Sequence, residues 1–168
     1  EDVTIKTRLL DARFICGDEP LANDMLAAFR EQAVKGRDAQ FIHDKLAERE
    51  NRHTRQGDAR YVVEPNLKEG KGGLRDLQTL YWIVKHMQGG HTLEDVMQNS
   101  LLTDHEYAVF IRAARFLWTV RCHLHFVTGR AEERLSFDLQ PEIAARMGYR
   151  DREGQQGVGA QCRDQHRD

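Results

Sequence analysis

The fold is decided by the longest helical pattern in the chain, residues 103–129, which reads TDHEYAVFIRAARFLWTVRCHLHFVTG. Apolar side chains recur in it every three or four residues, the spacing that places them on one face of an α-helix. Thr103 and Glu106 form a capping box at its start, and Gly129 is the residue type that most readily ends a helix. The pattern predicts one long central helix and, with it, a mainly α fold.

The same spacing on both sides of this stretch predicts a helical, bundle-like domain. Further helices are expected over residues 3–17, from Asp18 to a break at Gly36, and over 38–55, 73–89 and 141–147. The second of these begins at Asp18, a residue type favoured as an N-cap. Its apolar stripe, which we expect to be buried, consists of Leu21, Met25, Leu26 and Phe29.

The helical pattern breaks once between residues 59 and 73. Tyr61, Val62 and Val63 favour a strand, Pro65 cannot continue a helix, and three glycines follow closely. We expect an extended segment or a hairpin near residues 59–68 and a glycine turn at 70–73. After residue 150 few apolar residues remain, so the tail 151–168 is expected to be irregular or disordered.

Composition excludes several classes of protein. The 168 residues carry 25 Lys and Arg against 27 Asp and Glu, a net charge of −2, which lacks the basic excess of a nucleic-acid binder. No apolar run reaches the ~20 residues needed to span a membrane. Three widely spaced cysteines without a C-x-x-C motif are typical of reduced thiols, so we expect a cytoplasmic protein with no membrane partner.

The best candidate for a binding site is the stretch EPNLKEGKGGLRD, residues 64–76. Its glycines allow backbone N–H groups to approach a ligand, and the helix that follows favours an anion at its N-terminus. The candidate nucleotide- or phosphate-proximal residues are Lys68, Lys71, Gly72, Gly73, Arg75 and Asp76. The spacing is not that of a Walker A loop. The alternative is a structural turn whose Lys and Arg side chains pair with Glu64, Glu69 and Asp76.

A metal site at Cys122-His123-Leu124-His125 is the weaker hypothesis. Cys122 and His125 share a helix face, but His123 points away from them. Two ligands are fewer than the three or four of a zinc site, so helix packing is favoured for these side chains. The sequence offers no nucleophile–base pair and no paired carboxylates, so no catalytic or metal-binding residue is assigned.

Several separated stretches resemble the bifunctional PII uridylyltransferase/uridylyl-removing enzymes of bacterial nitrogen control. They are LLDARFICGD (9–18), EPNLKEGKGGLRDLQ (64–78), FLWTVR (116–121), LHF (124–126) and RLSFDLQ (134–140), and the resemblance covers about residues 1–152. In that family a nucleotidyltransferase domain, a helical domain, an HD phosphohydrolase domain and two ACT domains follow one another. The resemblance implies that residues 1–17 end the first domain and that residues 18–150 form the helical domain.

The resemblance also implies an activity, the transfer of UMP from UTP to a tyrosine of the PII signal protein, assisted by Mg²⁺. The family's Gly-Ser motif and Asp-x-Asp pair are absent here, so Mg²⁺ would be bound outside this chain, which is expected to be inactive alone. The HD metal ligands are also absent, and His43-Asp44 is not taken for them.

The chain is therefore expected to form one wall of the nucleotide cleft and a scaffold between domains, with UTP, PII and the other domains as partners. The alternative is a non-catalytic helical module that docks PII or a neighbouring domain. After Arg152 the resemblance stops, and a shifted reading frame is one hypothesis for the tail.

Overall fold

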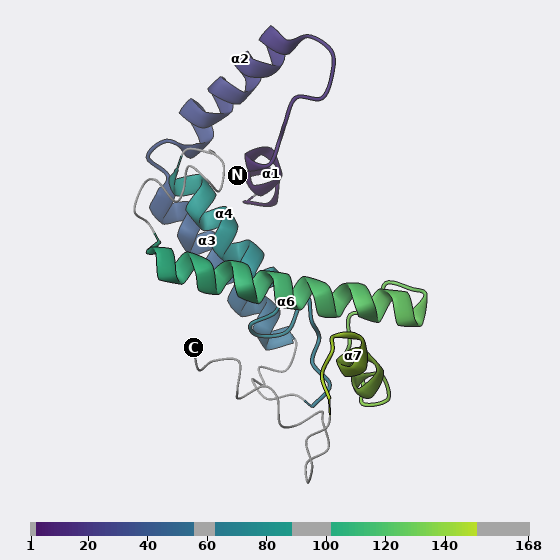
Figure 1. The fold of residues 1–168 in the computed structure, drawn as a ribbon. Helices are drawn as coiled ribbons and strands as arrows, with labels where there is room; N and C mark the ends of the chain where they lie inside the picture. The colour runs from purple at the N-terminus through teal and green to yellow at the C-terminus, as the bar shows by residue number, and fades with distance from the viewer. Residues whose placement is uncertain (1–2, 56–62, 89–101, 151–168) are drawn as a thin grey trace.

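The structure is a computed structural model that describes residues 3–55, 63–88 and 102–150. The elements in these residues are α1 (Val3–Leu10), α2 (Glu19–Phe29), the π-helical turn η1 (Arg30–Val34), α3 (Asp38–Arg55), α4 (Leu74–Met87), α6 (Asp104–Thr128) and α7 (Gln140–Arg146) (Figure 1). The expected mainly α fold is confirmed. None of the described helices is both long enough and apolar enough to cross a membrane.

The long helix α6 begins and ends as its sequence predicts. The Glu106 N–H donates to Thr103 Oγ1 at 3.2 Å, and the Thr103 N–H donates to Glu106 Oε2 at 2.8 Å. Gly129 ends the helix with φ +64°, a left-handed conformation that only glycine adopts without strain. Local signals within four residues are therefore sufficient to set both ends of this helix.

The buried apolar side chains form two separate clusters. The first cluster joins α1, η1 and α3 through Leu10, Val34 and Phe41, and Trp82 of α4 packs against it. The second cluster joins α6, α7 and the segment before the glycine turn; its buried members are Leu67, Val120, Leu124 and Ile143. Figure 1 shows α6 crossing α4 near one end and lying over α7 at the other. The predicted domain division after residue 17 stays a prediction, although α1 shares its core with α3.

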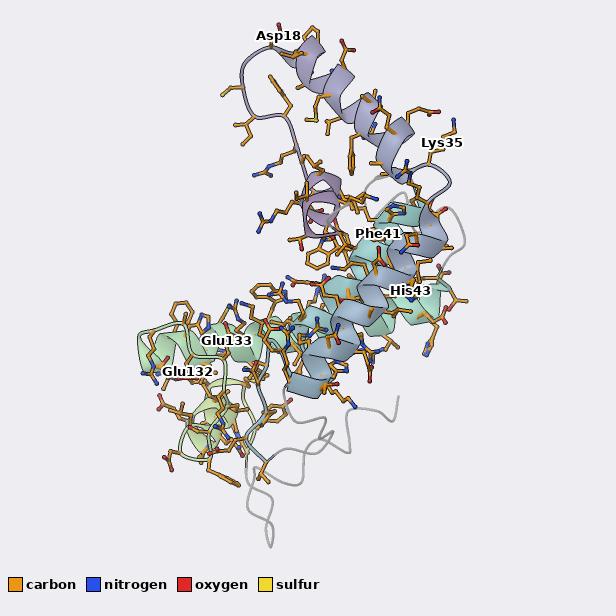
Figure 2. The ribbon with its side chains drawn as sticks, turned by 180° about the vertical axis from the view of Figure 1, so that it is seen from behind. Asp18, Lys35, Phe41, His43, Glu132 and Glu133 are labelled. Carbon is orange, nitrogen blue, oxygen red and sulfur yellow. The ribbon has the colours of Figure 1, made fainter. Side chains whose placement is uncertain are left out.

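Two predictions for the first helices are wrong. The first helix ends at Leu10 and not at Gly17, because the chain leaves the helix at Asp11, whose side chain binds α4. The N-cap at Asp18 is confirmed by its 3.0 Å bond from the Leu21 N–H, but no residue of α2 is buried. Figure 2 shows α2 projecting away from the other helices with Asp18 at its far end. Leu21 and Met25 of its apolar stripe are exposed, and the stripe is half-buried only in the last turn, where Phe29 packs against the first cluster.

The extended segment before the glycine turn pairs with a distant part of the chain. The Leu67 N–H donates to Glu133 O at 2.8 Å, and the Leu135 N–H donates to Pro65 O at 2.9 Å. This antiparallel bridge ties the turn to the end of α6. The described part of the predicted excursion is thus extended and paired with residues 133–135, whereas residues 59–62 and the tail 151–168 lie outside the described residues.

Asp11 fixes α1 on α4 through three donors. Its carboxylate accepts from Lys85 Nζ at 2.6 Å, Trp82 Nε1 at 3.0 Å and the Tyr81 hydroxyl at 3.2 Å. Partial burial favours a raised pKa for Asp11, but the bonds and charge of Lys85, with the other two donors, outweigh it and lower the pKa. The carboxylate is therefore ionised at neutral pH and holds the end of α1 in place.

Replacing Asp11 by alanine is expected to lower the free energy of unfolding by about 1–2 kcal/mol. A hydrogen bond to a charged group contributes roughly 1.5–3 kcal/mol, and we discount this because the Asp11 side chain is 44% exposed. Urea unfolding followed by circular dichroism measures the change. Asp24→Ala on the exposed α2 is the control, and an equal effect of both substitutions would contradict the role given to Asp11.

Candidate functional site

The glycine turn is built by hydrogen bonds that the chain makes to itself. Asn66 Oδ1 accepts from the N–H groups of Lys68 (3.0 Å) and Glu69 (2.7 Å), and Asn66 O accepts from the Gly70 N–H at 3.1 Å. Gly72 follows with φ +75°, in the left-handed region. The segment therefore reverses direction in a fixed turn that leads directly into α4.

The backbone amides at the start of α4 are also occupied within the chain. The N–H groups of Gly73, Leu74 and Arg75 donate to the carbonyls of residues 70, 67 and 68, each at 2.9 Å. The Gly72 N–H donates to Asp76 Oδ2 at 2.8 Å. Since free N–H groups are what would make a helix N-terminus an anion site, an anion at this turn would be bound by side chains and not by these amides.

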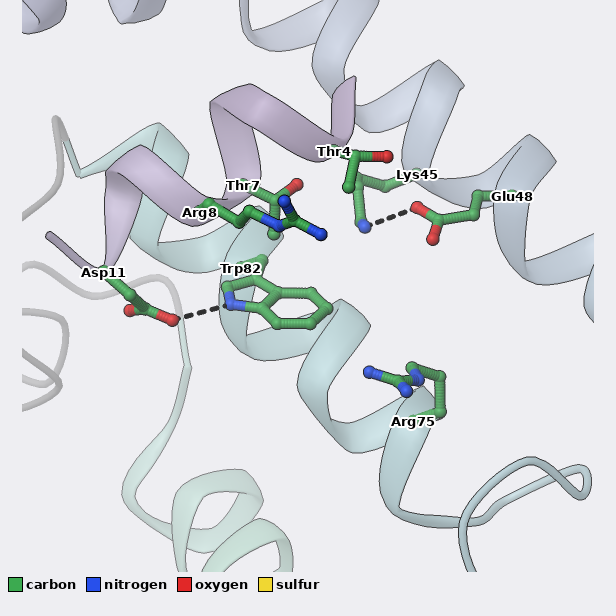
Figure 3. Close-up of a pocket in the computed structure, with 8 residues that line it drawn as sticks. All are labelled: Thr4, Thr7, Arg8, Asp11, Lys45, Glu48, Arg75 and Trp82. Atoms are coloured by element: carbon green, nitrogen blue, oxygen red, sulfur yellow. Dashed lines mark hydrogen bonds and ion pairs between the residues drawn. The ribbon is translucent and has the colours of Figure 1, made fainter. Parts of the chain in front are cut away.

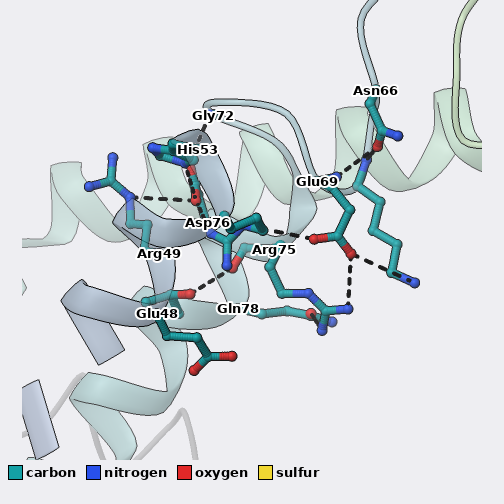
Figure 4. A network of polar contacts seen from close by, with 12 residues as sticks. Glu48, Arg49, His53, Asn66, Glu69, Gly72, Arg75, Asp76 and Gln78 are labelled. Carbon is teal, nitrogen blue, oxygen red and sulfur yellow. Dashed lines mark hydrogen bonds and ion pairs between the residues drawn. The ribbon is translucent and has the colours of Figure 1, made fainter. Parts of the chain in front are cut away.

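Asp76 is the centre of a polar network between α4 and α3 (Figure 4). Its carboxylate accepts from the Gly72 N–H and from the guanidinium of Arg52. His53 Nε2 lies 3.0 Å from each of its two oxygens. Burial favours a raised pKa for Asp76, but the bonds from Gly72, His53 and Arg52 outweigh it and lower the pKa. Asp76 thus holds the glycine turn against α3 as a charged group.

The neighbouring side chains bear out part of the structural alternative. Arg75 donates to Glu69 Oε1 at 3.2 Å, and Lys68 lies 4.0 Å from the same carboxylate oxygen. Glu64 pairs instead with Arg134, at 3.4 Å from its Nε. The partners of Asp76 come from α3 and not from the turn's own basic residues.

Arg75 also lines a pocket of about 420 Å³ between α1, α3 and α4. Figure 3 shows Arg8 and Lys45 on one side of the Trp82 ring and Arg75 on the other. Lys45 is almost fully buried; its Nζ lies 2.5 Å from Glu48 Oε2 and 4.6 Å from the centre of the Trp82 ring. Arg75 therefore belongs both to the polar contacts of the glycine turn and to this pocket, which residues of α1 also line.

Sequence reasoning named six site residues and missed others that complete the arrangement. The six lie together on the turn and the first turn of α4, whereas His53, Arg52 and Arg8 come from α3 and α1. Arg49, whose Nε lies 3.5 Å from Asp76 Oδ1, and His53 are four residues apart on one face of α3, and this spacing was the signal that the sequence offered. Nothing local to Arg8 indicates that it reaches the same pocket as Arg75.

The metal hypothesis at residues 122–125 gains no support from the described residues, where no group of three or more His, Cys, Asp or Glu side chains could hold a metal ion. His125 Nε2 lies 3.8 Å from Glu133, which Arg121 binds through two nitrogens. His43 is an exposed residue on the outer side of α3 and contacts only the adjacent Asp44, at 3.4 Å, in this part of the chain (Figure 2). The described side chains therefore do not fit a resident Mg²⁺.

Three relatives show how far the similarity extends. Each is named a bifunctional uridylyltransferase/uridylyl-removing enzyme. The protein of Phenylobacterium zucineum is 59% identical over 152 residues, which are 90% of this chain and 16% of that protein. A Bradyrhizobium protein (strain BTAi1) is 52% identical over 94% of this chain and 17% of its own length. The Cereibacter sphaeroides protein is 52% identical over 99% and 18%.

The chain thus spans about a sixth of the length of these relatives. No solved structure matches it. Residues 40–167 match the family described as GlnD PII-uridylyltransferase, so the similarity continues past Arg152, where the resemblance was expected to stop. Both the family match and the identity of the relatives cover most of the chain, and the chain belongs to the GlnD PII-uridylyltransferase family.

Proposed function

We propose that this chain is the helical part of a cytoplasmic enzyme that transfers UMP from UTP to a tyrosine of the PII signal protein and also removes it. The chain forms one wall of the nucleotide cleft and a scaffold between the nucleotidyltransferase domain and the HD and ACT domains. The observation that carries the proposal is the 59% identity to a bifunctional uridylyltransferase/uridylyl-removing enzyme over 90% of this chain.

The geometry of the turn supports the cleft wall. The hydrogen bonds of Asp76 hold the backbone of the turn in one position, so the basic side chains of the turn extend from a rigid backbone. A preorganised cation stabilises the negative charge of a phosphoryl group without having to reorganise during the reaction. In this proposal Lys71 and Arg75 attract and orient the UTP phosphates, and the carboxylates that hold Mg²⁺ belong to parts of the protein outside the described residues.

Replacing Lys71 and Arg75 together by glutamate in the protein at its natural length is expected to lower kcat/KM for UTP by 100-fold or more. Two attractive contacts with phosphate become repulsive ones, and each charge-assisted bond contributes about 1.5–3 kcal/mol. Steady-state uridylylation of PII measures the change.

Two comparisons decide the result. Lys71→Gln with Arg75→Gln removes the attraction without the repulsion, and is expected to show a smaller loss in the same direction. Arg130→Glu with Arg146→Glu changes the same charge at exposed positions just after α6 and on α7. Unchanged UTP affinity and turnover in the Lys71/Arg75 variants would overturn the cleft-wall role.

The second candidate function is a docking module for PII or a neighbouring domain. It is favoured by apolar side chains that stay exposed on two helices, Leu21 and Met25 on α2 and Trp118 and Phe126 on α6. Binding of PII to the chain without any effect of UTP would favour this function. Titration with UTP and with PII separately distinguishes it from the cleft wall.

A further inference from the structure

The pocket between α1, α3 and α4 gathers cations from three helices. Arg8 comes from α1, Lys45 from α3 and Arg75 from α4, and the only carboxylates among the lining residues are Asp11 and Glu48. Asp11 is already bound by Lys85, a residue that does not line the pocket. The lining therefore has a surplus of positive charge that its own acids do not neutralise.

The three cations differ in how many of their N–H groups already have a hydrogen-bond or ion-pair partner. Lys45 is committed to Glu48 and to the face of Trp82. Arg75 uses two of its nitrogens for Gln78 and Glu69. The guanidinium of Arg8 forms no hydrogen bond or ion pair in the part of the chain that the structure describes.

An arginine that faces a pocket with all five of its N–H groups available is suited to one kind of ligand. The planar guanidinium binds phosphate oxygens in pairs, and a second guanidinium across the pocket binds the next group of oxygens. Figure 3 shows both guanidinium groups directed toward the space beside the Trp82 ring. A volume of about 420 Å³ exceeds what a single phosphate ion needs and lies within the range of small-molecule sites.

We infer that this pocket binds a condensed phosphate chain, held between Arg8 and Arg75 and near the buried ammonium of Lys45. The chain of phosphates could be free pyrophosphate or part of a nucleoside triphosphate, which share this chemistry. The inference rests on the pocket itself and does not require the cleft-wall role. Arg75 belongs to both proposals, so Arg8 alone distinguishes them.

The test uses labelling of arginines by phenylglyoxal in the protein at its natural length, read for each arginine by peptide mass spectrometry. The labelling rate of Arg8 is compared without ligand and with inorganic phosphate, pyrophosphate or UTP. Pyrophosphate is expected to slow the labelling of Arg8 several-fold, while Arg130, exposed just after α6, keeps its rate. Arg8→Gln is expected to weaken pyrophosphate binding, measured by calorimetry, about tenfold, because one charge-assisted contact is lost.

Comparing the ligands shows whether the bound phosphates are free or part of a nucleotide. Protection by pyrophosphate assigns the site to a free phosphate chain, and protection by UTP alone assigns it to the nucleotide. No protection of Arg8 by either ligand at saturation, or unchanged pyrophosphate affinity in Arg8→Gln, would overturn the inference. UTP turnover that stays normal in Arg8→Gln while its pyrophosphate binding is weakened would separate this site from the nucleotide cleft.

Discussion

Replacing Asp76 by asparagine is expected to lower the free energy of unfolding by about 3 kcal/mol. The carboxylate is largely buried and is the shared acceptor for His53, Arg52 and the Gly72 N–H. Removing one partner of a buried ion pair costs about 3–5 kcal/mol, and Glu69, 3.8 Å from Arg52, can compensate a part of it. The asparagine amide would also direct N–H donors at groups that themselves donate. Urea unfolding of the chain at neutral pH measures this loss.

The pH dependence of the same variant gives a second measurement. The pKa of Asp76 is lowered in the folded chain, so its stabilisation is complete above the ordinary pKa of an unfolded aspartate and is lost as the pH falls through the lower, folded value. The difference between wild type and Asp76→Asn should therefore be constant near neutral pH and shrink in acid. Asp138→Asn, at an exposed aspartate, is the matched control and should change stability by less than about 0.5 kcal/mol. A loss no larger than in this control, or one independent of pH, would contradict the role of Asp76.

The parts of the fold that could be predicted are those set by neighbours in sequence. The capping box at Thr103, the N-cap at Asp18 and the glycine that ends α6 each depend on residues within about one helical turn. The apolar stripe of α2 is less buried than its sequence predicts, because periodicity shows which face is apolar but not how much of that face another element covers.

The sequence was sufficient to locate the candidate site but not to identify the distant residues that complete it. The glycine-rich stretch identified the turn, yet Asp76 finds His53, 23 residues earlier in the chain. Arg8 and Arg75 are also far apart in sequence and meet only because α1 packs beside α4. No local pattern encodes such pairs, so the partners of the turn had to come from the structure.

Replacing Gly73 by alanine is expected to lower the free energy of unfolding by about 3 kcal/mol, for a reason that the glycine pattern alone does not show. The φ of Gly73 is −77°, which any residue adopts, so the conformation itself does not require glycine. A Cβ at this position would lie 2.8 Å from Leu67 O, 2.9 Å from Gly70 O and 3.0 Å from Lys68 O. These three carbonyls accept the hydrogen bonds that start α4, so moving them to make room disrupts the turn. Thermal and urea unfolding of the variant measure the effect.

The neighbouring Gly72 provides the matched control because it needs glycine for its backbone conformation, whereas Gly73 needs it for lack of space. Gly72 has φ +75°, but a Cβ there would meet nothing within 4 Å, so alanine adds only the strain of the left-handed conformation, about 1–2 kcal/mol. Gly73→Ala should therefore be the more harmful substitution, although only Gly72 has a positive φ. The reverse order would mean that the carbonyls can move aside easily and that the turn is not rigid. A rigid turn is what the cleft-wall role needs, because it keeps Lys71 and Arg75 in place before a nucleotide binds.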